Sequence, residues 1–386
     1  MTLKIGVGKK TRRAYGFDEI ALCPGMITLD PEDVDTSVTI AGIKLEIPIF
    51  LAAMDGVINP QMAILAGKLG ATGVINLQGV QTRYEDVDKI LAQISSVSRD
   101  EYVPLMQKIY QEPIKTELII KRLKEIKAAG VPTIGSLTPQ VVEQYGPTVE
   151  KAGADALLIQ STVVSTKHKS KKFKPLDLKA YCKKSKIPVM VGNCVTYEVA
   201  LDLMKAGVAA VFVGIGPGAA CTSRGVLGVG VPMATAIADC AGARDDYYQK
   251  TKKYVPIIGD GGMTVGGDVC KAIACGADAV MIGSPFAKAK EAPGRGYHWG
   301  MATPSPVLPR GSRIQVGTIG TLEEILRGPA RYDDGSQNFL GAMQTSMSTL
   351  GASKIKEMQQ VEVVIAPSIL TEGKVYQKAQ SLGMYK

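Results

Sequence analysis

The chain has 386 residues, of which 46% are hydrophobic, and it carries a formal net charge of +9. This length allows one large domain or two modest ones, and without a run of about 18 apolar residues we expect no membrane span and no membrane partner. The aromatic content of 5% is too low for a base-stacking surface, so nucleic acid is not an expected partner. The N-terminal segment lacks the apolar core of a signal peptide, which predicts a cytoplasmic location.

Short apolar runs that stop at glycine or at a polar residue recur along the chain, and most of them are separated by a helical stretch. Three of these runs follow an Ala-Gly or Cys-Gly pair, which is typical of a helix end. Runs without polar alternation are typical of parallel strands that are buried on both faces. In chain order the eight predicted strands lie within 48–53, 72–76, 132–137, 151–160, 187–192, 205–214, 255–260 and 274–283.

Eight strands with intervening helices in a chain of this length predict a closed (β/α)₈ barrel in a single domain, residues 1–386. We expect the barrel core at about 45–290, and a lid with the C-terminal segment at about 291–386. The alternative, an open Rossmann-like sheet, is disfavoured because no GxGxxG motif follows the first strand. Apart from the stretch TLEEILRG, residues 287–344 are predicted to form loops over the barrel mouth.

The segment VGIGPGAACTSR at 213–224 is a strand that runs into a glycine-rich loop with Cys221 near its end. Glycines let the backbone turn its N–H and C=O groups inward, which suits an anion or a monovalent cation. The seven cysteines are scattered, without a CxxC pair, so neither a disulfide framework nor a structural zinc site explains this one. Because a nearby cation favours the thiolate, and Arg224 is close in sequence, Cys221 is the predicted nucleophile.

Two neighbouring predicted strands end in glycine-rich turns. The first ends at Asp260, before Gly261 and Gly262, where a carboxylate suits ribose hydroxyls and bare backbone suits a phosphate. The next strand ends at Gly283 and Ser284. Adjacent glycine-terminated strands form the usual phosphate cradle of such barrels, so the sequence predicts a phosphorylated ligand at this edge.

Four segments resemble the signature stretches of the IMP dehydrogenase and GMP reductase family. They are AAMDGVI at 52–58, VGNCVTYEVALDLMKAGV at 191–208, the cysteine loop, and GDGGMTVGGDVCKAIACGADAVMIGSPF at 259–286. The resemblance extends from about residue 17 to residue 358. It implies a (β/α)₈ barrel, assembled as a homotetramer or homo-octamer, that acts on GMP or IMP with a nicotinamide cofactor.

The resemblance also implies roles for the matching residues. Cys221 corresponds to the nucleophile that forms a thioimidate at C2 of the purine, and Asp260 corresponds to the acid that binds the ribose. The other substrate-binding positions are Met54, Asn193 near the reacting ring, Gly218, Gly262, Gly283 and Ser284 at the phosphate, and Gly300 and Met301 at the base. The cofactor-binding positions are Gln160, Ser161, Thr162, Gly214 and Gly216, and the carbonyl groups of Gly216, Gly218 and Cys221 correspond to a site for a monovalent cation such as K⁺.

The chain departs from the family pattern at several positions. Ser223 stands where the family has a threonine, and Arg310 stands where the family has the carboxylate or amide partner of that hydroxyl. Glu291 is the predicted replacement for this catalytic acid. Gln160 replaces an aspartate on the nicotinamide side, and His298 lies near the position of a tyrosine that reaches the phosphate. His298 is therefore a candidate to donate to the phosphate in its place, with a purely structural role as the alternative.

The segment after Gly300 and Met301 indicates the direction of the chemistry. The dehydrogenases of the family carry a long flap there, with an Arg-Tyr pair that activates water, whereas here only residues 302–320 precede TLEEIL. The dehydrogenases often also insert a pair of regulatory modules between early barrel strands, and residues 77–130 are too few for such a pair. A reductase must exclude water, so a short lid suits it. We expect a GMP reductase that converts GMP to IMP and ammonia with NADPH. The alternatives are an IMP dehydrogenase that converts IMP to XMP with NAD, and a catalytically inactive purine-nucleotide-binding protein.

Overall fold

The computed structural model describes residues 3–301, 311–366 and 374–383. Eight parallel strands form a closed barrel in chain order, and the last strand pairs with the first. The barrel strands are β6 (Ile49–Leu51), β7 (Thr72–Asn76), β8 (Ile134–Leu137), β9 (Ala156–Gln160), β10 (Val189–Cys194), β11 (Ala210–Val213), β12 (Ile257–Asp260) and β13 (Ala279–Ile282). Each overlaps one of the predicted runs, so the predicted (β/α)₈ barrel is confirmed and the open sheet is excluded.

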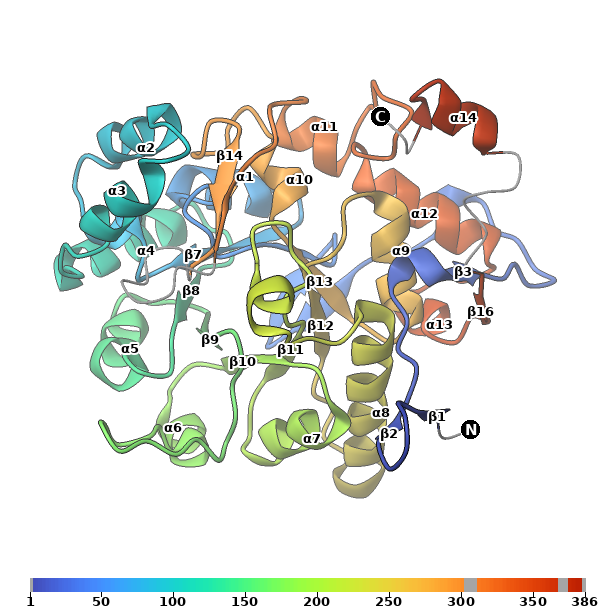
Figure 1. Cartoon of the computed structure of the whole chain (residues 1–386), viewed down its shortest axis with the longest axis horizontal. Helices are drawn as coiled ribbons and strands as arrows, with labels where there is room; N and C mark the ends of the chain where they lie inside the picture. The colour runs from blue at the N-terminus through green and yellow to red at the C-terminus, as the bar shows by residue number, and fades with distance from the viewer. Residues whose placement is uncertain (1–2, 302–310, 367–373, 384–386) are drawn as a thin grey trace.

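Helices follow the barrel strands and surround the ring (Figure 1). They are α1 (Pro60–Lys68), α4 (Thr116–Ala128), α5 (Val142–Lys151), α6 (Leu178–Lys184), α7 (Tyr197–Lys205), α8 (Met233–Thr251), α9 (Gly266–Ala274) and α10 (Ser284–Ala287). Polar caps fix where several of them begin. Asn59 accepts a hydrogen bond from the Met62 N–H at 2.8 Å before α1, and Asp177 accepts one from the Ala180 N–H at 2.9 Å before α6.

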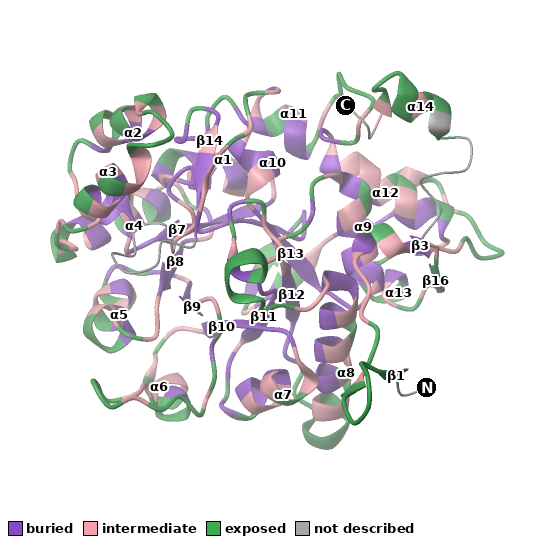
Figure 2. Ribbon diagram, in the orientation of Figure 1, coloured by how far each residue is buried: buried purple, intermediate pink, exposed green. Residues whose placement is uncertain are grey.

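The interior of the barrel is filled by apolar side chains, so it is a packed core and not a channel. Phe50 of β6 and Phe212 of β11 meet edge to face inside it, with ring centroids 5.8 Å apart. The hairpin of β4 (Val38–Ile40) and β5 (Ile43–Leu45) packs against the same interior cluster. Figure 2 shows buried strands at the centre and exposed residues on the outer turns of the helices. A ligand can therefore approach only at the ends of the strands.

A small helical pair lies between β7 and β8, next to β14 (Figure 1). It consists of α2 (Val87–Ser96) and α3 (Tyr102–Ile109), and it follows the 3₁₀ turn η3 (Val80–Thr82). Its buried side chains form an apolar cluster of their own, which also includes Trp299. The pair is therefore anchored on β14 as well as on the barrel.

The stretch 287–344, which we predicted to form loops apart from TLEEILRG, contains more regular structure than that. β14 (Tyr297–Trp299) pairs antiparallel with β15 (Arg313–Gln315), and α12 (Phe339–Thr349) packs against α9. The prediction was wrong because each strand has only three residues, too few to show alternation. The helix is rich in Gly, Ser and Thr, weak helix formers whose propensity is overridden by tertiary packing.

The remaining elements are short. They are β1 (Leu3–Lys4), β2 (Lys10–Thr11), η1 (Phe17–Glu19), β3 (Ile20–Leu22), η2 (Pro31–Asp33), the π-helical turn η4 (Ser223–Leu227), α11 (Leu322–Leu326), α13 (Ile355–Met358), β16 (Val363–Ile365) and α14 (Val375–Ala379). β16 pairs antiparallel with β3, which ties the C-terminal part of the chain to its N-terminal part.

Candidate active site

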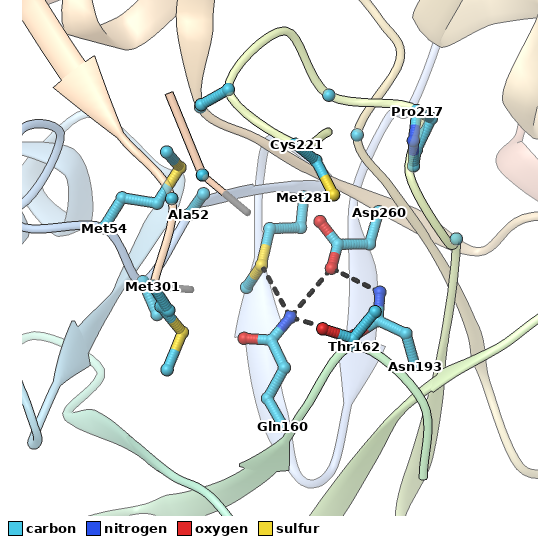
Figure 3. Close-up of a pocket in the computed structure, with 18 of the residues that line it drawn as sticks. Ala52, Met54, Gln160, Thr162, Asn193, Pro217, Cys221, Asp260, Met281 and Met301 are labelled. Atoms are coloured by element: carbon cyan, nitrogen blue, oxygen red, sulfur yellow. Dashed lines mark hydrogen bonds between the residues drawn. The ribbon is translucent and has the colours of Figure 1, made fainter. Parts of the chain in front are cut away.

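A cavity of about 730 Å³ opens at the carboxyl ends of the barrel strands. Figure 3 shows Met54 and Met301 on one side of it and Asp260 and Asn193 on the other. The predicted site residues that line the cavity are Met54, Gln160, Ser161, Thr162, Asn193, Gly214, Gly216, Gly218, Cys221, Ser223, Asp260, Gly262, Gly283, Ser284, His298, Gly300 and Met301. The structure brings these residues together, and their individual roles stay predictions.

Cys221 is exposed to the cavity on the loop between β11 and η4. Its thiol donates a weak hydrogen bond to Oγ of Ser223, with a sulfur–oxygen distance of 3.3 Å. The charge of Arg224 acts on Cys221, as we expected, but the hydrogen bonds of its guanidinium go to backbone carbonyls. Its Nε donates to the Ile215 carbonyl at 3.2 Å and its Nη2 to the Val231 carbonyl at 2.7 Å, so this arginine fixes the shape of the loop.

The loop approaches its neighbours closely. Gly214 has φ +153°, and a Cβ there would lie 2.2 Å from the Asp260 carbonyl oxygen, so only glycine fits between β11 and β12. The carbonyl of Gly218, one of the expected cation ligands, accepts a hydrogen bond from the Cys221 N–H at 3.0 Å. One of its lone pairs is therefore engaged within the loop.

Asp260, at the end of β12, is held by two amides. Its Oδ2 accepts hydrogen bonds from Nδ2 of Asn193 at 2.7 Å and from Nε2 of Gln160 at 2.8 Å, as Figure 3 shows. Nε2 of Gln160 also lies 3.1 Å from Oδ1 of Asn193. Burial raises the pKa of Asp260 to about 6, and the two amide donors lower it in part. Gln160, predicted on the cofactor side, is thus engaged with two residues predicted on the substrate side.

The side of the cavity predicted to bind phosphate contains glycine turns and a histidine. Gly262 adopts φ +79°, which favours glycine, and Ser284 follows Gly283 at the end of β13. Oγ of Ser284 lies 3.0 Å from Nε2 of His298. Nδ1 of His298 is buried without a partner, and burial lowers the pKa of this side chain to about 4. His298 is therefore a neutral ring with an unused polar atom at physiological pH.

One predicted catalytic residue, Glu291, is not found at this site. Glu291 does not line the cavity, and its Oε2 accepts a hydrogen bond from the Leu322 N–H at 2.9 Å, at the start of α11. The structure therefore places Glu291 away from the cavity, where its carboxylate serves a helix N-terminus that needs an acceptor. Arg310 lies outside the described residues.

The cavity wall also includes residues that we did not predict, among them Gln78, Arg83 and Tyr110. Beneath this wall, Oδ2 of Asp55 accepts hydrogen bonds from the Val80 N–H at 2.9 Å and from the Tyr110 hydroxyl. Burial raises the pKa of Asp55 to about 6. The chain gave no signal for Arg83 or Tyr110, because they lie in irregular segments far in sequence from every recognisable motif.

The described residues contain no group of three or more His, Cys, Asp or Glu side chains that could hold a metal ion. In the same residues, no helix is long and apolar enough to cross a membrane. All seven cysteines are free thiols.

Comparisons with known proteins agree on one family. Residues 14–302 match the family model described as the IMP dehydrogenase / GMP reductase domain. An uncharacterized oxidoreductase of Mycolicibacterium smegmatis is 37% identical, over 94% of this chain and 99% of the relative. An inosine-5′-monophosphate dehydrogenase of Borreliella burgdorferi is 30% identical, over 91% of this chain and 93% of the relative. The crystal structure of an IMP dehydrogenase/GMP reductase-like protein from Corynebacterium glutamicum superposes with a TM-score of 0.90 at 36% identity, covering 94% of this chain and 97% of that one.

Proposed function

This chain is a purine-nucleotide oxidoreductase of the IMP dehydrogenase / GMP reductase family, and we propose that it acts at C2 of a purine nucleoside 5′-monophosphate with Cys221 as the nucleophile. The observation that carries this proposal is that Cys221 opens into the same cavity as Asp260 and the glycine turns at Gly262 and Gly283. A thiol, a ribose acceptor and a phosphate cradle in one cavity are what covalent attack on a bound nucleotide requires.

Different residues of the cavity bind the ribose and the phosphate of the nucleotide. Ionised Asp260 accepts hydrogen bonds from the ribose hydroxyls, and the amides of Asn193 and Gln160 hold its carboxylate in place. The backbone at Gly262 and the Ser284–His298 pair receive the phosphate, and Nδ1 of His298 is a polar atom without a partner in the protein. With the backbone of Gly300 and Met301 at the base, these contacts hold C2 before Cys221, which converts the attack into an intramolecular step.

The cavity also fits a nicotinamide cofactor. At about 730 Å³ it has room beside a mononucleotide, and the hydroxyls of Ser161 and Thr162 with the bare backbone of Gly214 and Gly216 line the remaining wall. When bound, the nicotinamide accepts or supplies the hydride exchanged at C2. These residues would hold and orient it and exclude water from the reacting atoms.

We propose oxidation of IMP to XMP with NAD as the direction of the reaction. In this reaction the thiolate adds to C2, hydride passes from C2 to the bound NAD, and water hydrolyses the resulting thioimidate, which gives XMP and frees the thiol. The release of ammonia from GMP needs a proton donor at the amino group. Glu291, the predicted acid, is engaged with the Leu322 N–H outside the cavity, and the one carboxylate among the described lining residues is Asp260. The name of the Borreliella relative supports the same direction.

GMP reduction to IMP and ammonia with NADPH is the second candidate. It is favoured by the short connection between Met301 and Gly311, because Gly311 already forms an antiparallel bridge with Cys221. Residues 302–310 are too few for a long flap with its own catalytic pair. A short lid suits a reaction from which water is excluded.

Absorbance at 340 nm in two parallel reactions, IMP with NAD and GMP with NADPH, tests the proposal, with Cys221→Ala as the control. An increase only in the first reaction supports the dehydrogenase, and a decrease only in the second supports the reductase. Turnover by Cys221→Ala would contradict the covalent mechanism. Nucleotide binding without turnover in either reaction would indicate an inactive binding protein.

The assembly and the cation requirement of the protein are proposed from its family resemblance. We propose a homotetramer or homo-octamer in the cytoplasm, which light scattering tests for the assembly and fractionation for the location. We also propose that K⁺ binds the carbonyls of Gly216, Gly218 and Cys221. Replacing K⁺ by a bulky organic cation should then lower the rate.

A further inference from the structure

The β14–β15 hairpin touches the loop that carries the nucleophile. Gly311, just before β15, forms an antiparallel bridge with Cys221. The next residue, Ser312, donates its N–H to the Ala220 carbonyl at 3.0 Å. The backbone of the cysteine loop is therefore held from one side by the residues that lead into β15.

Arg313, the first residue of β15, joins the hairpin to the end of α2. Its Nη2 donates to the Val97 carbonyl at 2.8 Å and its Nη1 to the Ile94 carbonyl. These carbonyls lie at the C-terminal end of α2, where the helix dipole favours a cation. The guanidinium carbon lies 5.3 Å from the ring centre of Tyr102 and 4.8 Å from that of Tyr297. A planar group bonded at both amino ends and packed against two rings has little freedom to move.

Two more contacts tie the helical pair to the hairpin. The Tyr102 hydroxyl of α3 lies 3.5 Å from the Gly311 carbonyl oxygen and 3.4 Å from the Arg313 nitrogen. On the other strand, Nε1 of buried Trp299 donates to the Tyr110 hydroxyl at 2.9 Å. Both strands of the hairpin are thus fixed to α2–α3, one of them next to the residue that bridges Cys221.

We propose that Arg313 is a positioning residue that controls the reactivity of Cys221 from outside the cavity, through the hairpin. This inference rests on the proposed function, in which Cys221 attacks the nucleotide. The predicted binding groups Asp260 and Gly262 belong to β12 and the turn after it, a different part of the ring. His298, which we assign to the phosphate, lies on β14 opposite β15, but β14 has anchors of its own, from Trp299 to Tyr110 and from His298 to Ser284. Loss of Arg313 should therefore misplace the thiol and leave nucleotide binding largely intact.

The test compares Arg313→Ala, Arg313→Lys and a matched control, Arg327→Ala, by steady-state kinetics, nucleotide calorimetry and thermal unfolding. Arg327 also holds a carbonyl, that of Leu69 at 2.8 Å, but lies outside the cavity lining. We expect Arg313→Ala to lower kcat about 10- to 100-fold with little change in nucleotide Kd. Arg313→Lys should recover part of the loss, because an ammonium can still donate to one carbonyl. Arg327→Ala should keep the kcat of the native protein.

A native kcat in Arg313→Ala would overturn the proposal. A parallel loss of kcat, nucleotide affinity and melting temperature would also overturn it, because it would show that the variant destabilises the whole fold. If Arg313→Ala does not fold, Tyr102→Phe replaces it, because this change keeps the ring and removes only the hydroxyl beside Gly311. A lower kcat with unchanged Kd supports the proposal, and a native kcat contradicts it. Turnover in Cys221→Ala would instead defeat the proposed function, so the two failures are distinguishable.

Discussion

The side-chain amide of Gln160 donates to Oδ2 of Asp260 at 2.8 Å, across the mouth of the barrel from β9 to β12. A hydrogen bond to the ionised form lowers the pKa of a carboxyl, whereas burial raises it. In Asp260 burial is the larger effect, and its pKa lies at about 6. The amides of Gln160 and Asn193 therefore help to decide whether Asp260, the predicted ribose acceptor, is ionised near pH 6.

Nucleotide binding should weaken as the pH falls through about 6, because protonated Asp260 is a poorer acceptor for ribose hydroxyls. Gln160→Leu removes one donor and should move the midpoint of this loss to higher pH. Calorimetric Kd values between pH 5 and 8 check the shift. Gln144→Leu, on the exposed side of α5, is the matched control and should follow the native curve. An unchanged midpoint in Gln160→Leu would show that its amide does not set the charge of Asp260.

Asp260→Asn should stabilise the fold while it impairs nucleotide binding. The pKa of Asp260 is about 6 in the folded protein and 3.8 in an exposed chain, so the folded state holds the proton more tightly between these values. Stability contributed by this group therefore falls as the pH rises from about 4 to 6, and the ionised carboxylate costs up to about 3 kcal/mol above that range. Urea unfolding at pH 8 should show the gain in Asp260→Asn. A loss of stability at pH 8 would contradict this account.

His298→Phe should weaken the binding of nucleoside monophosphates by about 10- to 100-fold, the effect of losing one hydrogen bond to a charged group. The binding of the corresponding nucleoside should change little, because the nucleoside has no phosphate. Inhibition constants for both ligands check this difference. His168→Phe is the matched control, since His168 is the other histidine of the chain and is exposed. Equal losses for nucleotide and nucleoside would place His298 away from the phosphate.

Arg244→Met should destabilise the protein by about 1–3 kcal/mol, because buried Asp278 and the Gly276 carbonyl each lose a donor while Lys356 still pairs with Asp278. Nη1 of Arg244 lies 3.1 Å from Oδ2 of Asp278, and the two side chains are only 5% and 4% exposed. Lys127→Met breaks a pair with Asp155 in which the side chains are 46% and 32% exposed, and it should cost less than about 1 kcal/mol. Urea unfolding of both variants checks the contrast. Similar losses in the two would contradict the importance of burial here.

The eight strands could be located from the sequence because a parallel strand buried on both faces must be apolar throughout. The strand ends were also readable, since glycine and polar residues there mark the change from buried strand to exposed loop. This made Cys221, Asp260 and Gly283 recognisable as members of one site. The short strands of the β14–β15 hairpin have no such pattern, and the sequence alone did not indicate them.

Pairing between side chains was less predictable than their position along the chain. Glu291 has a plausible spacing for a catalytic acid, yet the start of α11 lies beside it and takes its carboxylate. Arg224 follows the cysteine closely, yet its donors reach the carbonyls of Ile215 and Val231. In both cases the sequence shows a charged side chain at a suitable spacing. Folding then places a backbone group next to it, an N–H for Glu291 and two carbonyls for Arg224, and the side chain binds that group.

The sequence by itself determined the barrel, the order of its strands and the chemical types at their ends, because burial and glycine turns leave local patterns. Only the tertiary structure decided which of these groups meet. Closure of the ring brings Gln160 and Asn193 to Asp260, and the packing of α2–α3 on the hairpin brings Arg313 into the support of the cysteine loop. Such contacts join residues that are far apart in the chain. They depend on three-dimensional packing, which cannot be predicted from a local sequence pattern.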